Sequence, residues 1–388
     1  MLCNRLTSRD NQMNDTEPTW IWQQSDWPNF HWQDEHIQPL LRTVRLKQGL
    51  LMGKTGAIYD KLPLESVLDT LLQNIIASSA IEGEQLNAQS VRSSLAKRMG
   101  LNLKQTYPTT ERSEGLAQMM LDAISNLNTP LTLERLLEWH QWLFPAVEQS
   151  IYSIQVGQLR GEEPMQVVSG RIDKPTIHFE APPRNRLEKE LITFIDWFNQ
   201  SRKDTTIDPL LRAAISHFWF VTLHPFDDGN GRITRALTDL ALAQEDQQSI
   251  RLYTMSASIL AKRSDYYRIL EESQRGTADI TQWLVWFLVT LEDSLKTAIA
   301  KIDHTLAKTR FWQRYQETEL LPEQIKVLNR LLDGGEKGFD HGISASQYQK
   351  VAKVSKATAT RHLADLLVKG CVEKLPGGGR NTRYQVKM

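Results

Sequence analysis

Residues 224–235 read HPFDDGNGRITR and lie between two apolar segments that both predict a helix. The preceding segment ends FWFVTL at residues 218–223, and the following one carries Ile233, Leu237 and Leu240 at helical spacing. The stretch must therefore turn sharply between two buried helices, and its two glycines let the backbone approach a ligand closely. Unpaired amides at the start of the second helix favour an anion as that ligand.

The charged residues of this stretch suit a nucleotide phosphate. Arg232 and Arg235 are three residues apart, so both guanidinium groups can reach phosphate oxygens from one helix face. Asp228 offers the hard oxygen ligand that Mg²⁺ uses together with substrate phosphates. His224 has an ordinary pKa of about 6.5 and can accept a proton from an attacking hydroxyl at neutral pH. The stretch predicts a phosphate site with its own base and metal ligand.

At every fixed position the stretch resembles the signature of Fic-domain proteins, His-x-Phe-x-(Asp/Glu)-Gly-Asn-Gly-Arg-x-x-Arg. The resemblance implies transfer of AMP from ATP to a hydroxyl side chain of a target protein, with release of pyrophosphate. It implies that His224 is the general base, that Phe226 anchors the loop and that Asp228 binds Mg²⁺. The ATP-binding residues that it implies are Gly229, Asn230, Gly231, Arg232 and, at the γ-phosphate, Arg235.

A hairpin is predicted upstream of this motif. Residues 166–168 and 176–179 are β-prone and are separated by a Ser-Gly pair. The hairpin lies where the family has a flap that pairs with the target's backbone by strand addition. The resemblance therefore implies a target-aligning flap made of Val167, Val168, Ser169 and Gly170, and an ordinary surface hairpin is the alternative.

Residues 78–83, SSAIEG, end a segment with apolar positions spaced by three and four. They resemble the family's inhibitory pattern, (Ser/Thr)-x-x-x-Glu-(Gly/Asn). Ser78 and Glu82 share one helix face, and Gly83 suits the turn that ends a helix. The resemblance implies that Glu82 pairs with Arg235 in place of the γ-phosphate and makes the enzyme autoinhibited. A second role of Glu82, in removing AMP again, stays open.

The basic C-terminal segment predicts another kind of domain. Residues 344–388 hold nine Lys or Arg against two Asp or Glu, although the whole chain has zero net charge. Two helices at 344–352 and 355–368, followed by a hairpin at 372–375 and 383–386, resemble a winged helix-turn-helix. We expect the second helix to point Lys356, Thr358, Thr360 and Arg361 outward and Leu363, Leu366 and Leu367 toward the core. Contact with DNA through residues 344–388 and contact with protein both stay open.

Length and composition set the remaining expectations. A chain of 388 residues predicts two or three domains, and 40% hydrophobic with 24% charged residues is typical of globular proteins. Two cysteines near opposite ends give no disulfide framework, and no apolar stretch is long enough for a membrane span, so we expect a cytoplasmic protein. The predicted parts are a tail (1–13), an N-terminal helical domain with an aromatic strap and the inhibitory helix (14–125), a Fic catalytic domain (126–310) and the winged helix (320–388).

The predicted fold class is mainly α: a Fic-type helical bundle with a small β-hairpin flap and a C-terminal winged helix-turn-helix. The predicted function is an autoinhibited protein adenylyltransferase that uses ATP and Mg²⁺ on a protein target or on itself, and family members often form homodimers. The alternatives are a DNA-binding regulator whose Fic portion senses ATP, an enzyme that also removes AMP, and a nucleotide donor other than ATP. We interpret four histidines as structural, and leave two tyrosines between core packing and an adenine pocket: His31, His140, His178, His217, Tyr266 and Tyr267.

Overall fold

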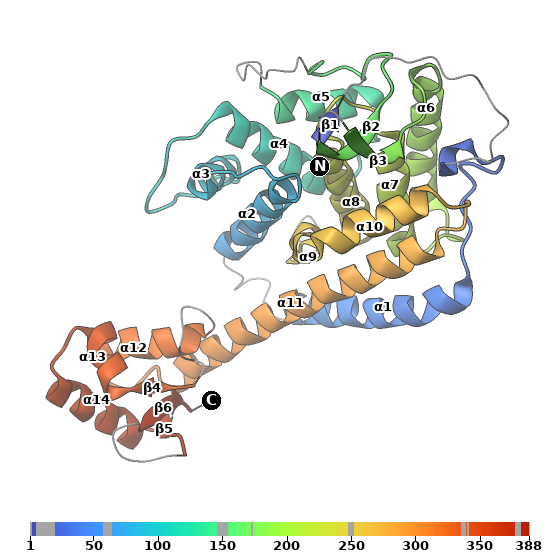
Figure 1. Ribbon diagram of the computed structural model, residues 1–388. Helices are drawn as coiled ribbons and strands as arrows, with labels where there is room; N and C mark the ends of the chain where they lie inside the picture. The colour runs from blue at the N-terminus through green and yellow to red at the C-terminus, as the bar shows by residue number, and fades with distance from the viewer. Residues whose placement is uncertain are drawn as a thin grey trace. The chain divides into compact units, whose positions relative to one another are not determined.

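The computed structural model describes residues 2–4, 20–56, 64–145, 154–171, 174–246, 252–334, 339, 341–376 and 382–387. They divide into two compact units, Met1–Ile299 and Ala300–Met388, and helix α11 (Thr281–Arg314) runs through the boundary (Figure 1). The mainly helical fold class is confirmed. No helix within these described ranges is both long and apolar enough to cross a membrane. Most of the predicted tail lies outside the described residues.

Two antiparallel helices form the centre of the first unit. Helix α7 (Pro209–Leu223) packs along α8 (Asn230–Asp246), and Phe218, Phe220 and Leu237 of these two helices are fully buried. Each such side chain stabilises the fold by about 1.5–3 kcal/mol. The surrounding helices are α1 (Asp34–Gly56), α2 (Leu64–Ile81), α3 (Ala88–Arg98), α4 (Glu111–Ser125), α5 (Leu133–Leu143), α6 (Arg184–Gln200), α9 (Met255–Ala261) and α10 (Arg263–Gln274). Short 3₁₀ turns occur at Ile21–Gln23 and Ser201–Lys203.

Helix α4 was not predicted from the sequence. Thr110 caps its first turn, and its side chain accepts a hydrogen bond from the Ser113 amide. Gly115 within it lowers the helical propensity, yet any Cβ at this position would lie 1.9 Å from the Trp142 carbonyl oxygen of α5. The glycine therefore exists for a close helix-helix approach, which no local pattern reveals. Helices α9 and α12 (Pro322–Asp333) were missed as well.

The predicted hairpin is present. Strands β2 (Gln166–Arg171) and β3 (Lys174–Glu180) pair antiparallel, with a bulge where the register shifts between Val167 and Val168. Strand β1 (Leu2–Asn4), inside the segment predicted as a tail, pairs with the other edge of β2. The hairpin edge therefore binds an extended segment of the chain's own backbone.

The aromatic strap is predicted at residues 14–33, of which 14–19 lie outside the described residues; residues 20–33 lie on the folded body. The Trp22 indole donates a hydrogen bond to the Glu180 carbonyl at 2.7 Å, at the end of β3. The Trp27 indole donates to Glu190 of α6, and the Phe30 ring packs against Trp219 of α7. The strap thus ties the hairpin and α6 to the central helices.

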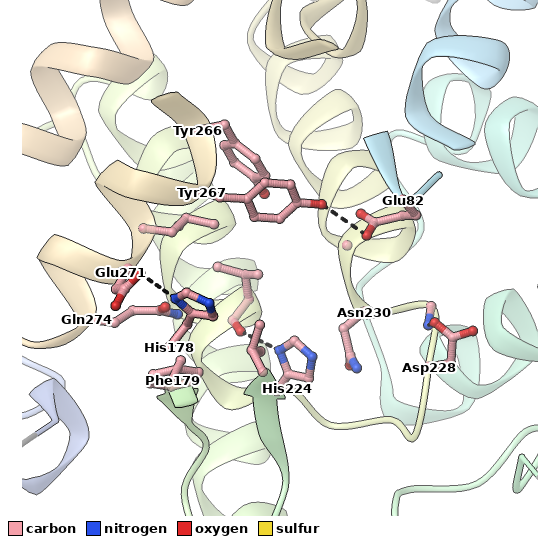
Figure 2. Close-up of a pocket in the computed structure, with 15 residues that line it drawn as sticks. Glu82, His178, Phe179, His224, Asp228, Asn230, Tyr266, Tyr267, Glu271 and Gln274 are labelled. Atoms are coloured by element: carbon pink, nitrogen blue, oxygen red, sulfur yellow. Dashed lines mark hydrogen bonds and ion pairs between the residues drawn. The ribbon is translucent and has the colours of Figure 1, made fainter. Parts of the chain in front are cut away.

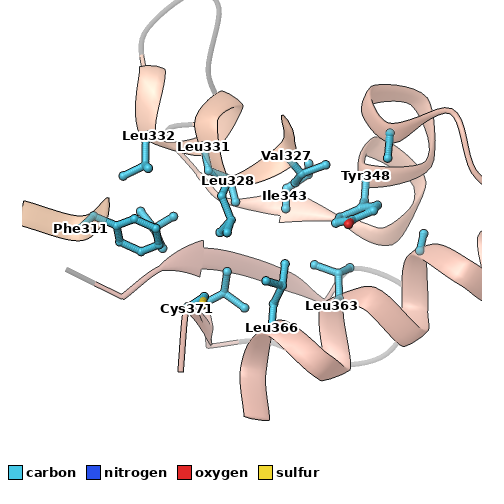
Figure 3. Packing of buried hydrophobic residues seen from close by; sticks show 14 residues of the cluster. Phe311, Val327, Leu328, Leu331, Leu332, Ile343, Tyr348, Leu363, Leu366 and Cys371 are labelled. Atoms are coloured by element: carbon cyan, nitrogen blue, oxygen red, sulfur yellow. The ribbon is translucent and has the colours of Figure 1, made fainter. Parts of the chain in front are cut away.

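The second unit has its own hydrophobic core (Figure 3). Helices α12, α13 (Ala345–Ala352) and α14 (Lys356–Val368) pack on a sheet of order β4-β6-β5, made of Ile343–Ser344, Arg383–Val386 and Val372–Lys374. These elements follow the order predicted for a winged helix-turn-helix, but that assignment and DNA contact stay predictions. Leu363 and Leu366 face the core as predicted. The expectation for Leu367 was wrong, because it is 41% exposed on the far side of the helix.

Candidate active site

The loop between α7 and α8 is held by its own polar groups. The Asn230 side chain accepts a hydrogen bond from the Phe226 amide at 2.9 Å and donates one to the Phe226 carbonyl at 2.8 Å. The Phe226 ring is fully buried and stacks on His140 at 4.4 Å between centroids. His140 donates through Nε2 to the Asp228 carbonyl. Asn230 therefore shapes the loop from inside, while Gly229 and Gly231 line the pocket.

His224 is fixed in one orientation. It caps α7 in the left-handed conformation, with φ 48°, and its ring is buried. Nδ1 lies 3.0 Å from the Val221 carbonyl, and since a carbonyl only accepts, Nδ1 carries the proton and Nε2 is the basic nitrogen. Burial lowers the pKa of His224, so the ring is neutral at pH 7. Arg160, also buried, holds the His224 carbonyl at 2.9 Å.

A pocket with about 810 Å³ of empty space, part of it open to solvent, lies in front of this loop. Tyr266, Tyr267 and Glu271 of α10 form one wall, and strand β3 contributes His178 and Phe179 (Figure 2). The pocket brings together these predicted site residues: His224, Asp228, Gly229, Asn230, Gly231, Glu82 and Val167.

Arg235 does not line the pocket and is bound by residues at the end of α2. Its Nε donates to the Ser78 hydroxyl and its Nη2 to the Ser78 carbonyl, both at 2.8 Å. Its Nη2 is also 2.8 Å from Glu82 Oε1, and the Tyr267 hydroxyl donates to the other Glu82 oxygen at 3.3 Å. Burial opposes ionisation of Glu82, but the charge of Arg235 outweighs it, so the pKa of Glu82 is lowered. The predicted ion pair is present.

Gly231 makes room for the Glu82 carboxylate. A Cβ at position 231 would lie 2.1 Å from Glu82 Oε1. The carboxylate therefore sits against the first turn of α8, where unpaired amides attract an anion. It occupies the place that the sequence predicts for a phosphate.

Asp228 fits a single-carboxylate magnesium ligand. Its side chain is 51% exposed, and one of its oxygens accepts from the Gly229 amide and lies 3.4 Å from Arg232 Nη2. No cluster of three metal-ligating side chains occurs in the described parts of the chain. Mg²⁺ commonly takes one or two carboxylates and completes its shell with phosphates and water, so the residues present fit that ion.

Some predicted residues lie outside the pocket, and some pocket residues were not predicted. The predicted site residues that do not line the pocket are Arg232, Arg235, Ser78, Gly83, Val168, Ser169 and Gly170. His178, interpreted as structural, lines the pocket and pairs with Glu271 at 2.7 Å. A β-bulge between Val167 and Val168 is consistent with a site at this hairpin, because bulges redirect side chains. The bulge is defined by the pairing of the two strands, so the sequence alone does not reveal it.

Two parts of the chain match known families. Residues 20–101 match a domain of unknown function, DUF4172, and residues 130–242 match the Fic/DOC family. A protein adenylyltransferase fic-1 of Caenorhabditis elegans is 25% identical over 211 residues, which are 54% of this chain and 37% of that protein. A protein adenylyltransferase Fic of Drosophila sechellia is 27% identical over 209 residues, 54% of this chain and 38% of that protein. The matches thus span less than half the length of these curated relatives.

The fold is similar to that of a solved structure. A crystal structure of a Fic family protein from Desulfovibrio desulfuricans G20 superposes with a TM-score of 0.51 at 21% sequence identity. The match covers 90% of this chain and 96% of that one. These findings confirm the predicted family resemblance and the predicted helical architecture.

Proposed function

We propose that this chain, which carries a Fic/DOC family domain, is an autoinhibited protein adenylyltransferase. It transfers AMP from ATP to a hydroxyl side chain of a protein target. The relatives named above are adenylyltransferases, which supports AMP transfer in general. The observation that carries the proposal for this chain is a neutral His224, with Nε2 as its basic nitrogen, lining the same pocket as Asp228, Gly229 and Gly231.

The transfer follows from these groups. The target's hydroxyl gives its proton to His224 Nε2, and its oxygen bonds to the α-phosphorus while the bond to the bridging oxygen breaks and pyrophosphate leaves. The amides at the start of α8 and the guanidinium of Arg232 stabilise the charge that develops on the phosphates. Asp228 would hold Mg²⁺, which supplies further charge neutralisation there when bound.

The pair between Glu82 and Arg235 supports autoinhibition. Arg235 is 2% exposed, and Glu82 takes the guanidinium that the resemblance assigns to the γ-phosphate. A nucleotide must break a largely buried ion pair to use Arg235 itself, and breaking such pairs costs about 3–5 kcal/mol. The resting protein therefore binds ATP in a poor orientation or not at all.

The hairpin edge supports target binding by strand addition. Strand β1 pairs with β2 with Leu2 opposite Val168 and Asn4 opposite Gln166. An extended segment of a target would use the same backbone groups. The hydroxyl to be modified would then be aligned by backbone pairing rather than by a side-chain pocket.

Isotope transfer tests the function directly. We expect Glu82→Gly to move label from α-labelled ATP, but not from γ-labelled ATP, onto itself or onto lysate proteins, at least about tenfold faster than the unmodified chain. Glu65→Gly, at the exposed start of α2, is the matched control and should stay inactive. The Glu82→Gly/His224→Ala protein should transfer nothing; persistent transfer would show that His224 is not the base. A regulator that merely senses ATP would show binding without transfer in all variants.

A further inference from the structure

Arg232, the first arginine of the motif, also pairs with a carboxylate, and that carboxylate lies outside the inhibitory pattern. Glu84 Oε2 lies 2.7 Å from Arg232 Nη1. Glu84 follows the turn at Gly83, which has φ +83°, and its amide bonds to the Ser79 carbonyl at 3.0 Å. The same turn that presents Glu82 to Arg235 thus presents Glu84 to Arg232.

The other oxygen of Glu84 is held by a third arginine. Arg112, in the first turn of α4, donates to Glu84 Oε1 through Nε at 2.9 Å and through Nη2 at 2.7 Å. One carboxylate therefore bridges two guanidinium groups with three short, charge-assisted hydrogen bonds. That is the arrangement in which arginines bind a phosphate group.

Both guanidinium groups have donors that Glu84 does not use. Within the part of the chain that the structure describes, Arg112 Nη1 and Arg232 Nε are buried without a hydrogen-bond partner. Unpaired buried donors of a charged group are costly. A phosphate group has more acceptor oxygens than a carboxylate, so it can satisfy donors that Glu84 leaves unpaired.

Phe144 places Arg112 next to the phosphate loop. The Arg112 guanidinium lies 5.2 Å from the centroid of the Phe144 ring and that of Arg232 lies 5.1 Å from it. The same ring is packed against Gly229, where a Cβ would lie 2.9 Å from it. Arg112 is therefore one aromatic ring away from the loop amides, although it is distant in sequence from the motif.

We propose that Arg112 is a third phosphate-binding arginine of the nucleotide site, and that Glu84 occupies its place until the outer phosphates of ATP replace it. Glu84 is 25% exposed and belongs to a turn, whereas Arg232 and Arg112 are 5% and 12% exposed and belong to helices, so the carboxylate is the group that moves. The proposal deepens the proposed function and depends on it for the identity of the anion. Arg112 would bind the pyrophosphate portion of ATP, which AMP lacks.

A stepwise series of two variants, read out by equilibrium binding, tests this. Arg112 binds Glu84 before ATP arrives. Removing Arg112 alone therefore weakens the Glu84 pair of the free protein as well as the ATP complex, and the two losses partly cancel in the measured ATP affinity. The affinities for ATP and for AMP, each with Mg²⁺, are therefore measured for the full chain, Glu84→Gln and Glu84→Gln/Arg112→Gln. We expect Glu84→Gln to bind ATP about tenfold more tightly, and the added Arg112→Gln to weaken ATP about tenfold again. AMP affinity should stay the same within twofold across the set.

A matched control pair includes a residue of the same helix as Arg112, α4. Arg98 and Glu114 form an ion pair between α3 and α4 away from the pocket, so Arg98→Gln and Glu114→Gln should leave both affinities unchanged. The proposal is overturned if Glu84→Gln fails to tighten ATP, or if Arg112→Gln in that background leaves ATP unchanged or weakens ATP and AMP equally. Should the Arg112→Gln protein not fold, Arg112→Lys replaces it, and the gain in Glu84→Gln stands as an independent test. ATP affinities that change as expected, without AMP transfer in any variant, would reject the proposed function and keep this site.

Discussion

The loop at residues 224–235 and the turn at residues 82–84 meet at the same pocket but are stabilised in opposite ways. The loop is closed by buried hydrogen bonds of Asn230 and by the stacked pair of His140 and Phe226. The turn is held to the loop's helix by ion pairs of two partly exposed carboxylates, Glu82 and Glu84. A buried network is built to persist, whereas partly exposed carboxylates can be exchanged for another anion.

Under the proposed function, this difference would let one pocket be both complete and inactive. The groups proposed to perform the chemistry already lie together at the pocket, so activation would not require rebuilding of the loop. It would require only that Glu82 and Glu84 leave Arg235 and Arg232. Changes in the loop should therefore affect stability and activity together, while exchange of the turn's carboxylates for the phosphates of a nucleotide should change activity without rebuilding the loop.

The largest effect on stability should come from acidifying the loop's support. Burial lowers the pKa of His140 from 6.5 to about 4, so the unfolded chain takes up a proton at a higher pH than the folded one. The stabilisation is complete above pH 6.5 and is lost as the pH falls toward 4, by about 3 kcal/mol in total. The free energy of unfolding, measured in denaturant from pH 7.5 to 4, tests this loss. The His140→Gln side chain can still donate and accept hydrogen bonds but does not titrate, so the variant should lose about 3 kcal/mol less over this pH range.

The turn should respond at lower pH than the loop. The pKa of Glu82 lies below its usual 4.5, because Arg235 outweighs the effect of burial. The Glu82 pair therefore keeps its contribution above that value and loses it only as the pH falls further. ATP affinity measured from pH 7.5 to 4 tests this order. If ATP binding becomes tighter between pH 6.5 and 5 while the loop is still folded, the Glu82 pair is lost before the His140 contribution and the predicted order is wrong.

A smaller loss is expected from Asn230→Ala. It removes two buried hydrogen bonds to the Phe226 backbone and should lower the free energy of unfolding by about 2 kcal/mol. Asn199→Ala is a close control, because Asn199 makes the same two bonds to the Leu131 backbone far from the pocket. Both variants should lose similar stability in denaturant, but only Asn230→Ala should abolish AMP transfer in the Glu82→Gly background. Equal transfer in the two would mean that the loop's shape does not matter.

The sequence could predict the residues of the loop because their chemistry is concentrated in twelve consecutive positions. The sequence also predicted that Glu82 pairs with Arg235. The inhibitory pattern is local, and the resemblance to the family implied Arg235 as the partner of its glutamate. The sequence could not predict that His178 and Glu271 line the pocket, or that Arg112 of α4 pairs with Glu84 next to the motif. Each of these depends on contacts between distant segments, and Gly115 shows how such a contact can even weaken the local signal.

The smallest effect should come from the hydroxyl that steadies the turn's ion pair. Ser78→Ala removes the hydrogen bond from Arg235 Nε but keeps the one to the Ser78 carbonyl, so Arg235 becomes slightly easier to capture. AMP transfer by the otherwise unmodified chain should rise about fivefold, the equivalent of one ordinary hydrogen bond, with the melting temperature nearly unchanged. The neighbouring Ser79 is buried, and its hydroxyl has no hydrogen-bond partner among the described residues, so Ser79→Ala should leave transfer as it is. A rise of equal size in both variants would mean that looser packing of α2, and not the grip on Arg235, limits the reaction.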